Sequence, residues 1–339
     1  MQQTNKVIYL QDAHCYKKFY PFTHTIHTGQ MLSGRYTMQQ RWAAVMGCEV
    51  HCIRNNSTPD GITIFSADDY PANYHLPTLN NTYQIVALNA KIIALDVAKV
   101  KTTVSHPFPK NCNIIGTNIV HIGNNVIANY CIFNTSNGPI IIEDDVVIME
   151  AAILKGPLVI KRNAVIKACA QIYGGTTIGK KCTIGGEVKN AILLYASNKA
   201  HHGYLGDSYI GAWCNLGAGT SNSNVKNTGG TINYYSEYLG HVEAISNKAG
   251  ILMGHYSRTA INTALNSGTV IGVSANVFGV GLTPKFIDHF TWGYDHFSPY
   301  TFTEAIAHIN NWMAFKNEQL PAETEELLQK LFKKLIRPA

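Results

Sequence analysis

Residues 142–184 read IEDDVVIMEAAILKGPLVIKRNAVIKACAQIYGGTTIGKKCTI, and this stretch decides the fold. An aliphatic residue stands at every sixth position, namely Ile142, Ile148, Leu154, Ile160, Ile166, Ile172, Ile178 and Ile184. A helix repeats near 3.6 residues and a half-buried strand repeats at 2, so neither explains a period of six. A solenoid of short strands and tight turns explains it, because each coil buries its apolar row against neighbouring coils. The repeat predicts a left-handed parallel β-helix.

The repeat is interrupted twice, and we expect the chemistry at the interruptions. A second row of small or branched residues follows the first by four positions, from Val146 to Val188. The pattern is lost at residues 190–204 and again at 221–250. It then returns in phase at Met253, Thr259, Leu265, Ile271 and Val277. Insertions in solenoids form loops on one face, often the binding face, so both interruptions are expected to be such loops.

The chain before the solenoid lacks the six-residue period. Residues 1–100 are expected to form a small α/β domain, with a strand at 7–10 and a helix at 36–46. Residues 101–300 are expected to form the β-helix. The sequence therefore predicts a mainly β fold in which a small α/β part precedes the solenoid.

Residues 301–339 are expected to be helical, because 302–315 and 322–336 have the helical spacing of apolar residues. Acidic residues begin the second of these helices and basic residues end it, which complements the helix dipole. The terminal repeats of a solenoid need a cover. We therefore expect this tail to cap the open end of the solenoid.

Composition excludes some classes of function. Only 14% of the residues are charged, against about 25% in typical soluble domains, which suits a solenoid surface of Asn, Thr, Ser and Gly. The net charge of +6 comes without a dense run of Lys and Arg. This charge is too weak for a nucleic-acid-binding face, but it favours phosphorylated small molecules as ligands.

The cysteines and the N-terminus indicate the compartment. Among the eight cysteines, Cys48 and Cys52 form the only close pair, so no zinc site is completed. The first residues lack the charged start and long apolar core of a signal peptide. No apolar run is long enough to span a membrane. A reduced, cytoplasmic protein without a protein-bound metal is expected.

The densest polar segment fills the first interruption. It reads SNKAHHGYLGD at residues 197–207, with Lys189 shortly before it and NLGAGT at 215–220 after it. One coil is about eighteen residues, so these three segments should stack close together. A histidine there can take a proton near neutral pH, a lysine can hold a phosphate, and turn amides can stabilise an oxyanion. The alternative is that the histidines are ordinary solvated loop residues.

These residues resemble a known family. The stretches 198–207 and 215–220 closely resemble the acetyltransferase domain of the bifunctional N-acetylglucosamine-1-phosphate uridyltransferase/glucosamine-1-phosphate acetyltransferase family. That family carries Lys-Ala-Gly-His-x-x-Tyr-Leu-Gly-Asp followed by Asn-x-Gly-Ala-Gly-Thr. The chain looks most like its short Bacteroidetes variant, described as sugar nucleotidyltransferases. The resemblance covers most of residues 100–300 and implies a role in UDP-N-acetylglucosamine or nucleotide-sugar synthesis.

The resemblance implies roles for the polar residues. His201, three positions before Tyr204, takes the place of the general base that deprotonates the sugar amine. Lys189 and Tyr204 resemble the phosphate-binding and sugar-binding pair. Asn215 and Asn224 resemble the asparagines of the sugar pocket. The substrate implied is an aminosugar phosphate such as glucosamine-1-phosphate.

The resemblance also implies acetyl-CoA as the co-substrate. The residues expected beside it are Ala218, His255 and Val273. The main-chain amide of Ala218 is expected to meet the acetyl carbonyl, and His255 stands where the family has a serine. Transfer would be direct, without an acyl-enzyme. Members of the family are trimers with each site built between neighbouring solenoids, so a homotrimer is implied.

The chain departs from the family pattern around the histidines. The family's glycine before the histidine is absent, so His202 is a second candidate for the base. The family's upstream phosphate-binding arginine has no counterpart. Gln171 is expected one coil before Lys189, with Lys167 nearby.

The N-terminal part departs further. Nucleotidyltransferases have a Gly-rich loop and an arginine around the triphosphate, whereas residues 21–27 read PFTHTIH, with Ile26 at the arginine position. Arg35 and Arg41 remain as phosphate contacts or as solvated surface residues. This part is expected to be a degenerate nucleotidyltransferase-like domain, requiring Mg²⁺ only if it is active.

Other functions remain to be weighed against acetyl transfer. One is a sugar-1-phosphate nucleotidyltransferase in which the β-helix serves oligomerisation. Another is a purely structural solenoid, which tolerates the histidine segment but does not need it. A β-helix carbonic anhydrase is discounted, because it needs a His-x4-His pair that the solenoid lacks.

Overall fold

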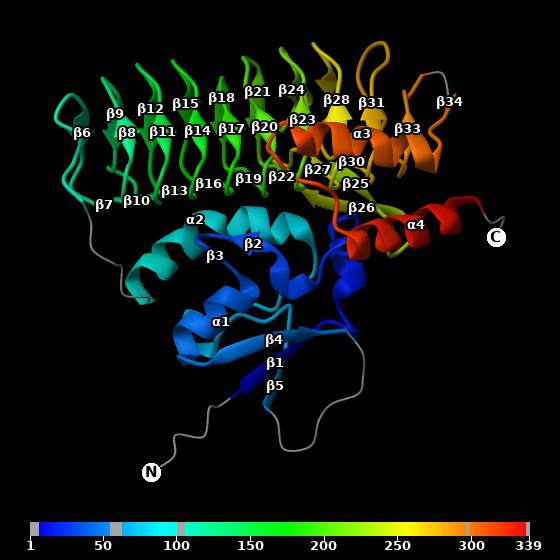
Figure 1. The fold of residues 1–339 in the computed structure, drawn as a ribbon, viewed down its shortest axis with the longest axis horizontal. Helices are drawn as coiled ribbons and strands as arrows, with labels where there is room; N and C mark the ends of the chain where they lie inside the picture. Colours follow the sequence, from blue (N-terminus) through cyan, green and yellow to red (C-terminus); the bar gives the residue numbers. More distant parts are fainter. Residues whose placement is uncertain (1–6, 55–62, 100–105, 296–297, 337–339) are drawn as a thin grey trace.

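The structure is a computed structural model that describes residues 7–54, 63–99, 106–295 and 298–336. Its main body is a solenoid of three parallel sheets, and the predicted fold class, a left-handed parallel β-helix with a small α/β part and C-terminal helices, is confirmed (Figure 1). Successive strands of each sheet come from successive coils. The antiparallel pairing of the last two strands of the ten-stranded sheet is an exception.

The strand bounds follow the coils. The nine-stranded sheet contains β7 (Val120–Ile122), β10 (Ile140–Ile142), β13 (Leu158–Ile160), β16 (Thr176–Ile178), β19 (Ile192–Leu193), β22 (Tyr209–Ile210), β27 (Leu252–Met253), β30 (Val270–Ile271) and β32 (Phe286–Ile287). The ten-stranded sheet contains β8 (Ile127–Ala128), β11 (Val147–Ile148), β14 (Val165–Ile166), β17 (Thr183–Ile184), β20 (Asn198–Lys199), β23 (Asn215–Leu216), β28 (Arg258–Thr259), β31 (Asn276–Val277), β33 (Thr291–Trp292) and β34 (Ser298–Pro299). The six-stranded sheet contains β6 (Asn113–Ile115), β9 (Ile132–Asn134), β12 (Ile153–Lys155), β15 (Gln171–Ile172), β18 (Glu187–Lys189) and β21 (Tyr204–Gly206), and the pair β24 (Ser221–Asn222) and β29 (Ala264–Leu265) follows it.

Three corners join the sheets of each coil. The lysine corner leads from the six-stranded to the nine-stranded sheet and carries Lys189 and Asp207. The buried corner leads from the nine-stranded to the ten-stranded sheet and carries Trp213. The histidine corner leads from the ten-stranded to the six-stranded sheet and carries His201 and Ala218.

The aliphatic row of the repeat forms the core of the solenoid. All eight residues from Ile142 to Ile184 point inward and are at most 1% exposed. The second row is buried with them, including Cys182. Each coil supplies one such layer, and the layers stack on strand spacings of about 4.8 Å. The period of six is therefore the distance along the chain from one sheet to the next.

The first predicted interruption is not a loop. Strands β18 to β21 continue the solenoid through residues 190–204, with Thr177 opposite Ile192 and Thr183 opposite Asn198. The register slips because the turn Gly185-Gly186 is short, so that Val188 follows Ile184 as the next inward residue. The prediction of an inserted loop at 190–204 was wrong, because a shortened turn and an insertion both break a periodic pattern.

The second interruption is an insertion, as predicted. Residues 221–250 contain an antiparallel hairpin of β25 (Ile232–Ser236) and β26 (His241–Ser246). The solenoid resumes at β27, and the residues predicted to return in phase occupy inward strand positions from Met253 to Val277.

The N-terminal part is a three-stranded parallel sheet with helices. The strand order is β4 (Glu49–Ile53), β1 (Val7–Gln11), β5 (Thr63–Ser66), and a short hairpin pairs β2 (Leu32–Ser33) with β3 (Tyr36–Thr37). The helices are α1 (Met38–Met46) and α2 (Thr82–Lys99), with 3-10 turns η1 (Tyr16–Phe19), η2 (Phe22–His24), η3 (Thr28–Gln30) and η4 (Ala72–Tyr74). The predicted strand and helix are present, whereas the predicted boundary at residues 100–101 lies outside the described residues.

Helix α2 lies between this sheet and the solenoid, against the nine-stranded sheet (Figure 1). Apolar contacts dominate this junction. Asn89 of α2 donates to the carbonyl of Gly175 at 2.7 Å, and the Tyr209 hydroxyl donates to the Leu32 carbonyl at 3.1 Å. The first bond holds α2 beside the lysine corner, and the second joins β2 to the nine-stranded sheet.

The C-terminal helices α3 (Phe302–Ala314) and α4 (Ala322–Ile336) confirm the helical prediction. They do not cap the open end as predicted. They pack on the buried corner of several coils, against Trp213, Tyr256 and Phe290, so that α3 runs alongside the solenoid (Figure 1). Large aromatic residues at this corner provide the apolar surface that the helices cover.

Candidate functional site

A row of outward side chains crosses the six-stranded sheet at its lysine corner. Lys155 and Lys189 end strands β12 and β18, and Tyr173 directly follows β15 between them. The Lys155 ammonium lies 4.6 Å from the Tyr173 ring centre. Two strand spacings, about 10 Å, separate the two lysine backbones. Lys248, at the end of the insertion, reaches the same place. Gln171 is displaced from Lys189 by this geometry, since it pairs with Glu187.

These lysines line a pocket of about 570 Å³, which we call the lysine pocket. Its polar lining consists of Asn137, Lys155, Tyr173, Lys189, Asn190, Asp207, Asn224 and Lys248. Among the described residues no ion pair involves Lys155, Lys189 or Lys248. Three unpaired ammonium groups around one cavity favour a phosphorylated ligand.

Asp207 organises the polar wall of the lysine pocket. Asn190 donates to one of its carboxylate oxygens at 2.7 Å, and Asn224 donates to the other at 2.6 Å. Asn224 also donates to the Tyr204 hydroxyl at 3.0 Å. The arrangement brings together Lys189, Tyr204 and Asn224, three of the predicted substrate-binding residues. It adds Lys155, Asp207 and Lys248, which were not among the predicted residues.

The Tyr204 hydroxyl is available as a donor. Burial and the nearby carboxylates of Asp207 and Glu187 raise the pKa of Tyr204 to about 12. The phenol therefore keeps its proton at neutral pH. Since Asn224 already donates to its oxygen, the remaining O–H proton can be offered to a ligand hydroxyl.

The two candidate bases are exposed at the histidine corner. His201 and His202 precede Gly203, one strand length from the lysine pocket. That strand, β21, has three residues and is about 10 Å long. Both imidazoles face solvent, so a substrate can reach either of them. A ligand held at the lysines can therefore extend along β21 toward this corner.

A buried lysine supports the histidine corner from inside. Lys199 points into the solenoid where the neighbouring coils have Ile184 and Leu216, and it is 2% exposed. Its ammonium donates to the carbonyls of Gly185 at 2.9 Å and His201 at 2.6 Å. One of these carbonyls belongs to the shortened turn and the other to the histidine corner of the next coil, and the lysine satisfies both.

The remaining predicted residues lie elsewhere. Asn215 is on the outer face of the ten-stranded sheet, between Asn198 and Arg258, and not in the lysine pocket. Ala218 is partly exposed at the histidine corner, one coil beyond His201. Within one chain, Asn215 and the lysine pocket therefore occupy different faces.

His255 and Val273 are not beside Ala218. Both lie at the buried corner, at most 2% exposed. The His255 ring packs against Phe22, and its Nδ1 accepts from the amide of Ala212 at 2.9 Å. The structure corrects their assignment to the acetyl-CoA site, because a ligand at Ala218 cannot reach a different, covered corner.

The residues that extend the row of Ala218 are Ile261 and Val280. They follow at the histidine corner of the next two coils, and their exposed fractions are 69% and 87%. The amide of Asn262 donates to the Ala218 carbonyl at 2.7 Å, which stacks the first two coils directly. An exposed aliphatic edge therefore begins beside the histidines and runs toward the C-terminal coils.

The N-terminal arginines are paired with carboxylates. Arg41 is fully buried, and its guanidinium donates to both oxygens of Asp96 at 2.9 and 3.0 Å, so it is not a free phosphate contact. Arg35 approaches Glu143 at 3.7 Å. At the carboxyl end of β1, Asp12 is fully buried and accepts hydrogen bonds from Arg54. This pair occupies the sheet edge at which open α/β sheets usually bind ligands.

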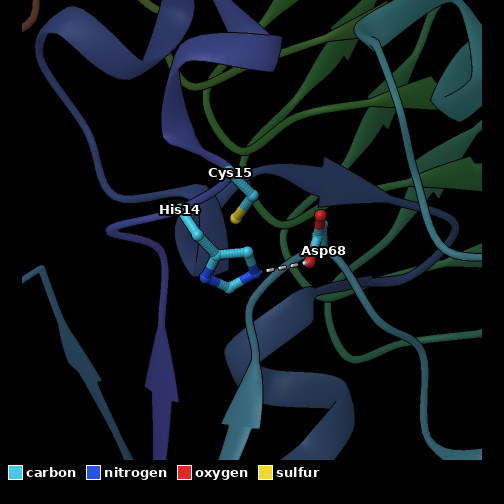
Figure 2. Close-up of side chains that lie close together, drawn as sticks. All are labelled: His14, Cys15 and Asp68. Atoms are coloured by element: carbon cyan, nitrogen blue, oxygen red, sulfur yellow. Dashed lines mark ion pairs between the residues drawn. The ribbon is translucent and has the colours of Figure 1, made fainter.

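Two groups of possible metal ligands occur in the described part of the chain. His14, Cys15 and Asp68 lie at the carboxyl ends of β1 and β5 (Figure 2). Burial raises the pKa of the Cys15 thiol to about 12. The thiol is therefore protonated, and Lys18 holds the Asp68 carboxylate at 3.0 Å, so this group is a poor ligand set.

The second group joins three distant segments. His24 of η2 and His289 of the buried corner approach one oxygen of Glu237 at 2.5 and 3.3 Å. The Nδ1 of His289 accepts from the Val273 amide, which leaves the proton on Nε2. A protonated Nε2 cannot bind a metal, so this group is a hydrogen-bonded clamp between the hairpin, the N-terminal part and the solenoid.

No protein-family model matches the chain. Its sequence is similar to curated bifunctional GlmU proteins, which confirms the resemblance. The Clostridium kluyveri protein is 30% identical over 168 residues, covering 48% of this chain and 34% of that protein. The Wigglesworthia glossinidia brevipalpis protein is 31% identical over 170 residues, covering 49% and 33%. The chain thus spans about a third of the length of these relatives.

Two solved structures are also similar, at low scores. An Arabidopsis UDP-N-acetylglucosamine acyltransferase is 12% identical, with 68% of this chain and 90% of that chain covered and a TM-score of 0.24. The acetyltransferase domain of PglB from Neisseria gonorrhoeae, in complex with acetyl coenzyme A, is 10% identical, with 87% and 99% covered and a TM-score of 0.22. None of the described helices is long and apolar enough to cross a membrane.

Proposed function

We propose that the protein is an acetyl-CoA-dependent N-acetyltransferase acting on an aminosugar phosphate, within nucleotide-sugar synthesis. One observation carries the proposal. A pocket with three unpaired lysines lies one short strand away from a corner that exposes two histidines. A phosphate anchor and a proton acceptor thus lie at the two ends of the same strand, β21. The similarity to bifunctional GlmU proteins supports the same function.

In this proposal the lysine pocket holds the sugar phosphate. Lys155, Lys189 and Lys248 bind the phosphate, and the Tyr204 hydroxyl and the Asn224 amide face the sugar hydroxyls. Asp207 keeps Asn224 in place. The sugar amine then points along β21 toward His201 and His202.

The proposed reaction is a direct transfer. A histidine of the histidine corner, His201 or His202, accepts a proton from the sugar ammonium. The free amine attacks the thioester carbonyl, and the main-chain amide of Ala218 stabilises the oxyanion. The C–N bond forms as the C–S bond breaks, and coenzyme A leaves as a thiol after receiving a proton. Holding both reactants in one geometry supplies much of the acceleration.

The aliphatic edge suits the pantetheine arm of acetyl-CoA. Ala218, Ile261 and Val280 present apolar surface in a line that starts at the histidines. Exposed apolar residues in such a line indicate a binding surface. We therefore propose Ile261 and Val280, in place of His255 and Val273, as the residues beside the co-substrate.

The proposal includes a homotrimer. Exposed apolar residues gather at the first coils, namely Ile114, Ile115, Ile119, Ile127 and Tyr130. Asn215 faces away from the lysine pocket of its own chain, so it serves a site only if a second copy packs against that face. The alternative, nucleotidyl transfer by the N-terminal part, gains no support from the paired Asp12 and Arg41.

The test is acetyl transfer by the full chain. Purified protein is mixed with acetyl-CoA and glucosamine-1-phosphate, and free thiol is measured. We expect the wild type to release thiol. The rate of release should fall at least 100-fold in one of the two variants His201→Ala and His202→Ala, and that variant identifies the base. His241→Ala, an exposed histidine of the hairpin, is the control and should retain full activity. Absence of release above background from a trimeric preparation contradicts the proposal.

A further inference from the structure

A second pocket adjoins the lysine pocket. It has a volume of about 360 Å³ and lies between helix α2 and strand β26 of the insertion. Asn190, Asp207 and Lys248 line both cavities, so the two share a wall. We call this second cavity the α2 pocket. A ligand anchored at the lysines can extend over the shared wall into it.

The α2 pocket exists because other segments cover the lysine corner. A bare solenoid would leave Asn190 and Asp207 on an open edge. Here α2 supplies Gln84 and Ala87 on one side, and the hairpin supplies Ile245 and Ser246 on the other. The lining mixes apolar groups with an amide and main-chain atoms, which suits a flat ring with polar edges.

The charged groups are also spread over more than one phosphate position. Lys155, Lys189 and Lys248 surround the shared region, while Asp207 is the one carboxylate among the residues that line the two pockets. The Asp207 charge is already hydrogen-bonded by Asn190 and Asn224. The three ammonium groups match a diphosphate, whose two negative charges lie on two phosphates and are spread over a greater length than those of a monoester.

We infer that the acceptor is a nucleoside diphosphate-linked aminosugar, whose nucleoside occupies the α2 pocket and whose diphosphate lies across Lys189 and Lys248. The inference rests on the proposed function for the sugar end, but it assigns a separate site for the nucleoside. The volume of the α2 pocket is sufficient for a nucleoside, since small-ligand pockets start near 300 Å³.

Binding of UDP to the full chain tests this site without requiring catalysis. Isothermal titration compares UDP with glucosamine-1-phosphate on the wild type and on Ala87→Trp, which fills the α2 pocket from an exposed helical position. Ala94→Trp is the matched control, because Ala94 is also exposed on α2 and lines neither pocket. Circular dichroism checks that both variants are folded.

We expect UDP to bind at least tenfold more tightly than glucosamine-1-phosphate. Ala87→Trp should weaken UDP at least tenfold and leave glucosamine-1-phosphate within twofold, and Ala94→Trp should change neither. UDP binding that is no tighter than glucosamine-1-phosphate, or that survives Ala87→Trp, overturns the inference while acetyl transfer to glucosamine-1-phosphate still stands. If the wild type binds UDP but releases no thiol from acetyl-CoA, the proposed function is refuted and the nucleoside site still stands.

Discussion

The ammonium of Lys199 lies inside the solenoid and donates to the main-chain carbonyl of His201 at 2.6 Å. No carboxylate is among its hydrogen-bond partners in the described structure. Burial therefore lowers the pKa of Lys199 to about 8. A core position that is aliphatic in the neighbouring coils thus holds a polar group that supports the corner carrying both candidate bases.

The first prediction concerns the pH dependence of stability that Lys199 creates. Its folded pKa lies below its unfolded value, so between pH 8 and 10.5 the unfolded chain binds more protons. The free energy of unfolding should rise with pH across this window. The shift corresponds to about 3 kcal/mol at most. Urea unfolding at pH 7, 9 and 10.5 should show this rise in the wild type and its loss in Lys199→Met.

The control for this prediction is Lys180→Met. Lys180 is exposed, so its replacement should leave the pH dependence of the wild type unchanged. Parallel curves for the wild type and Lys199→Met would show that the ammonium carries no burial cost.

The sequence predicted the frame because a repeating core is a local signal. Each aliphatic residue from Ile142 to Ile184 marks one inward strand position, and the spacing alone identifies the architecture. The same signal could not separate a shortened turn from an insertion. Gly185-Gly186 removes residues and the segment 221–250 adds them, yet both appear only as a loss of phase.

The site was predicted only in part, for two physical reasons. All corners of a hexad repeat look alike in sequence, so a match can slip by one corner. His255 and Val273 were misplaced in this way, whereas Ile261 and Val280 occupy the intended corner. Lys155 and Lys248 were missed because coil stacking and the insertion, rather than sequence distance, bring them to Lys189.

The second prediction concerns Gly186, whose φ is +68°. A Cβ there would meet the carbonyl oxygens of His201 and Gly203 at 2.7 and 2.9 Å. Because these are main-chain atoms of the next coil, Gly186→Ala should displace the histidine corner. We expect a loss of stability of roughly 3 kcal/mol and a large loss of acetyl transfer.

Gly229→Ala is the matched control for Gly186→Ala. Its φ is +67°, but a Cβ there would meet nothing within 4 Å. It should cost only the backbone strain, about 1 kcal/mol, and leave activity intact. Thermal unfolding compares the two variants, and equal losses would contradict a role for the coil contact.

The third prediction concerns the phosphate anchor. Lys189→Ala and Lys155→Ala should each raise the KM for glucosamine-1-phosphate about tenfold or more, because each removes a charge-assisted hydrogen bond. The KM for acetyl-CoA should stay within twofold. Lys180→Ala is the control, because Lys180 is exposed and does not line the lysine pocket. Steady-state kinetics at two salt concentrations should also show a weaker salt dependence in the two pocket variants.

The last prediction concerns the clamp of His24, Glu237 and His289. Burial alone would raise the pKa of Glu237, but hydrogen bonds from both histidines outweigh it and lower this pKa to about 2. A depressed carboxyl pKa stabilises the fold above the unfolded value of about 4.5, and this contribution is lost as pH falls toward 2. Glu237→Ala should therefore cost about 3 kcal/mol near neutral pH.

The pH dependence distinguishes the Glu237 clamp from simple packing. The difference in unfolding free energy between the wild type and Glu237→Ala should shrink steadily between pH 4.5 and 2. In this range the carboxyl of the unfolded chain is already protonated, whereas the carboxylate of the folded chain gains its proton only near pH 2. Glu49→Ala removes a similar but exposed pair with His51, and it should cost no more than about 0.5 kcal/mol at any pH. Denaturant unfolding from pH 7 down to pH 3 measures both, and a Glu237→Ala loss that is constant over this range would assign the clamp to side-chain packing alone.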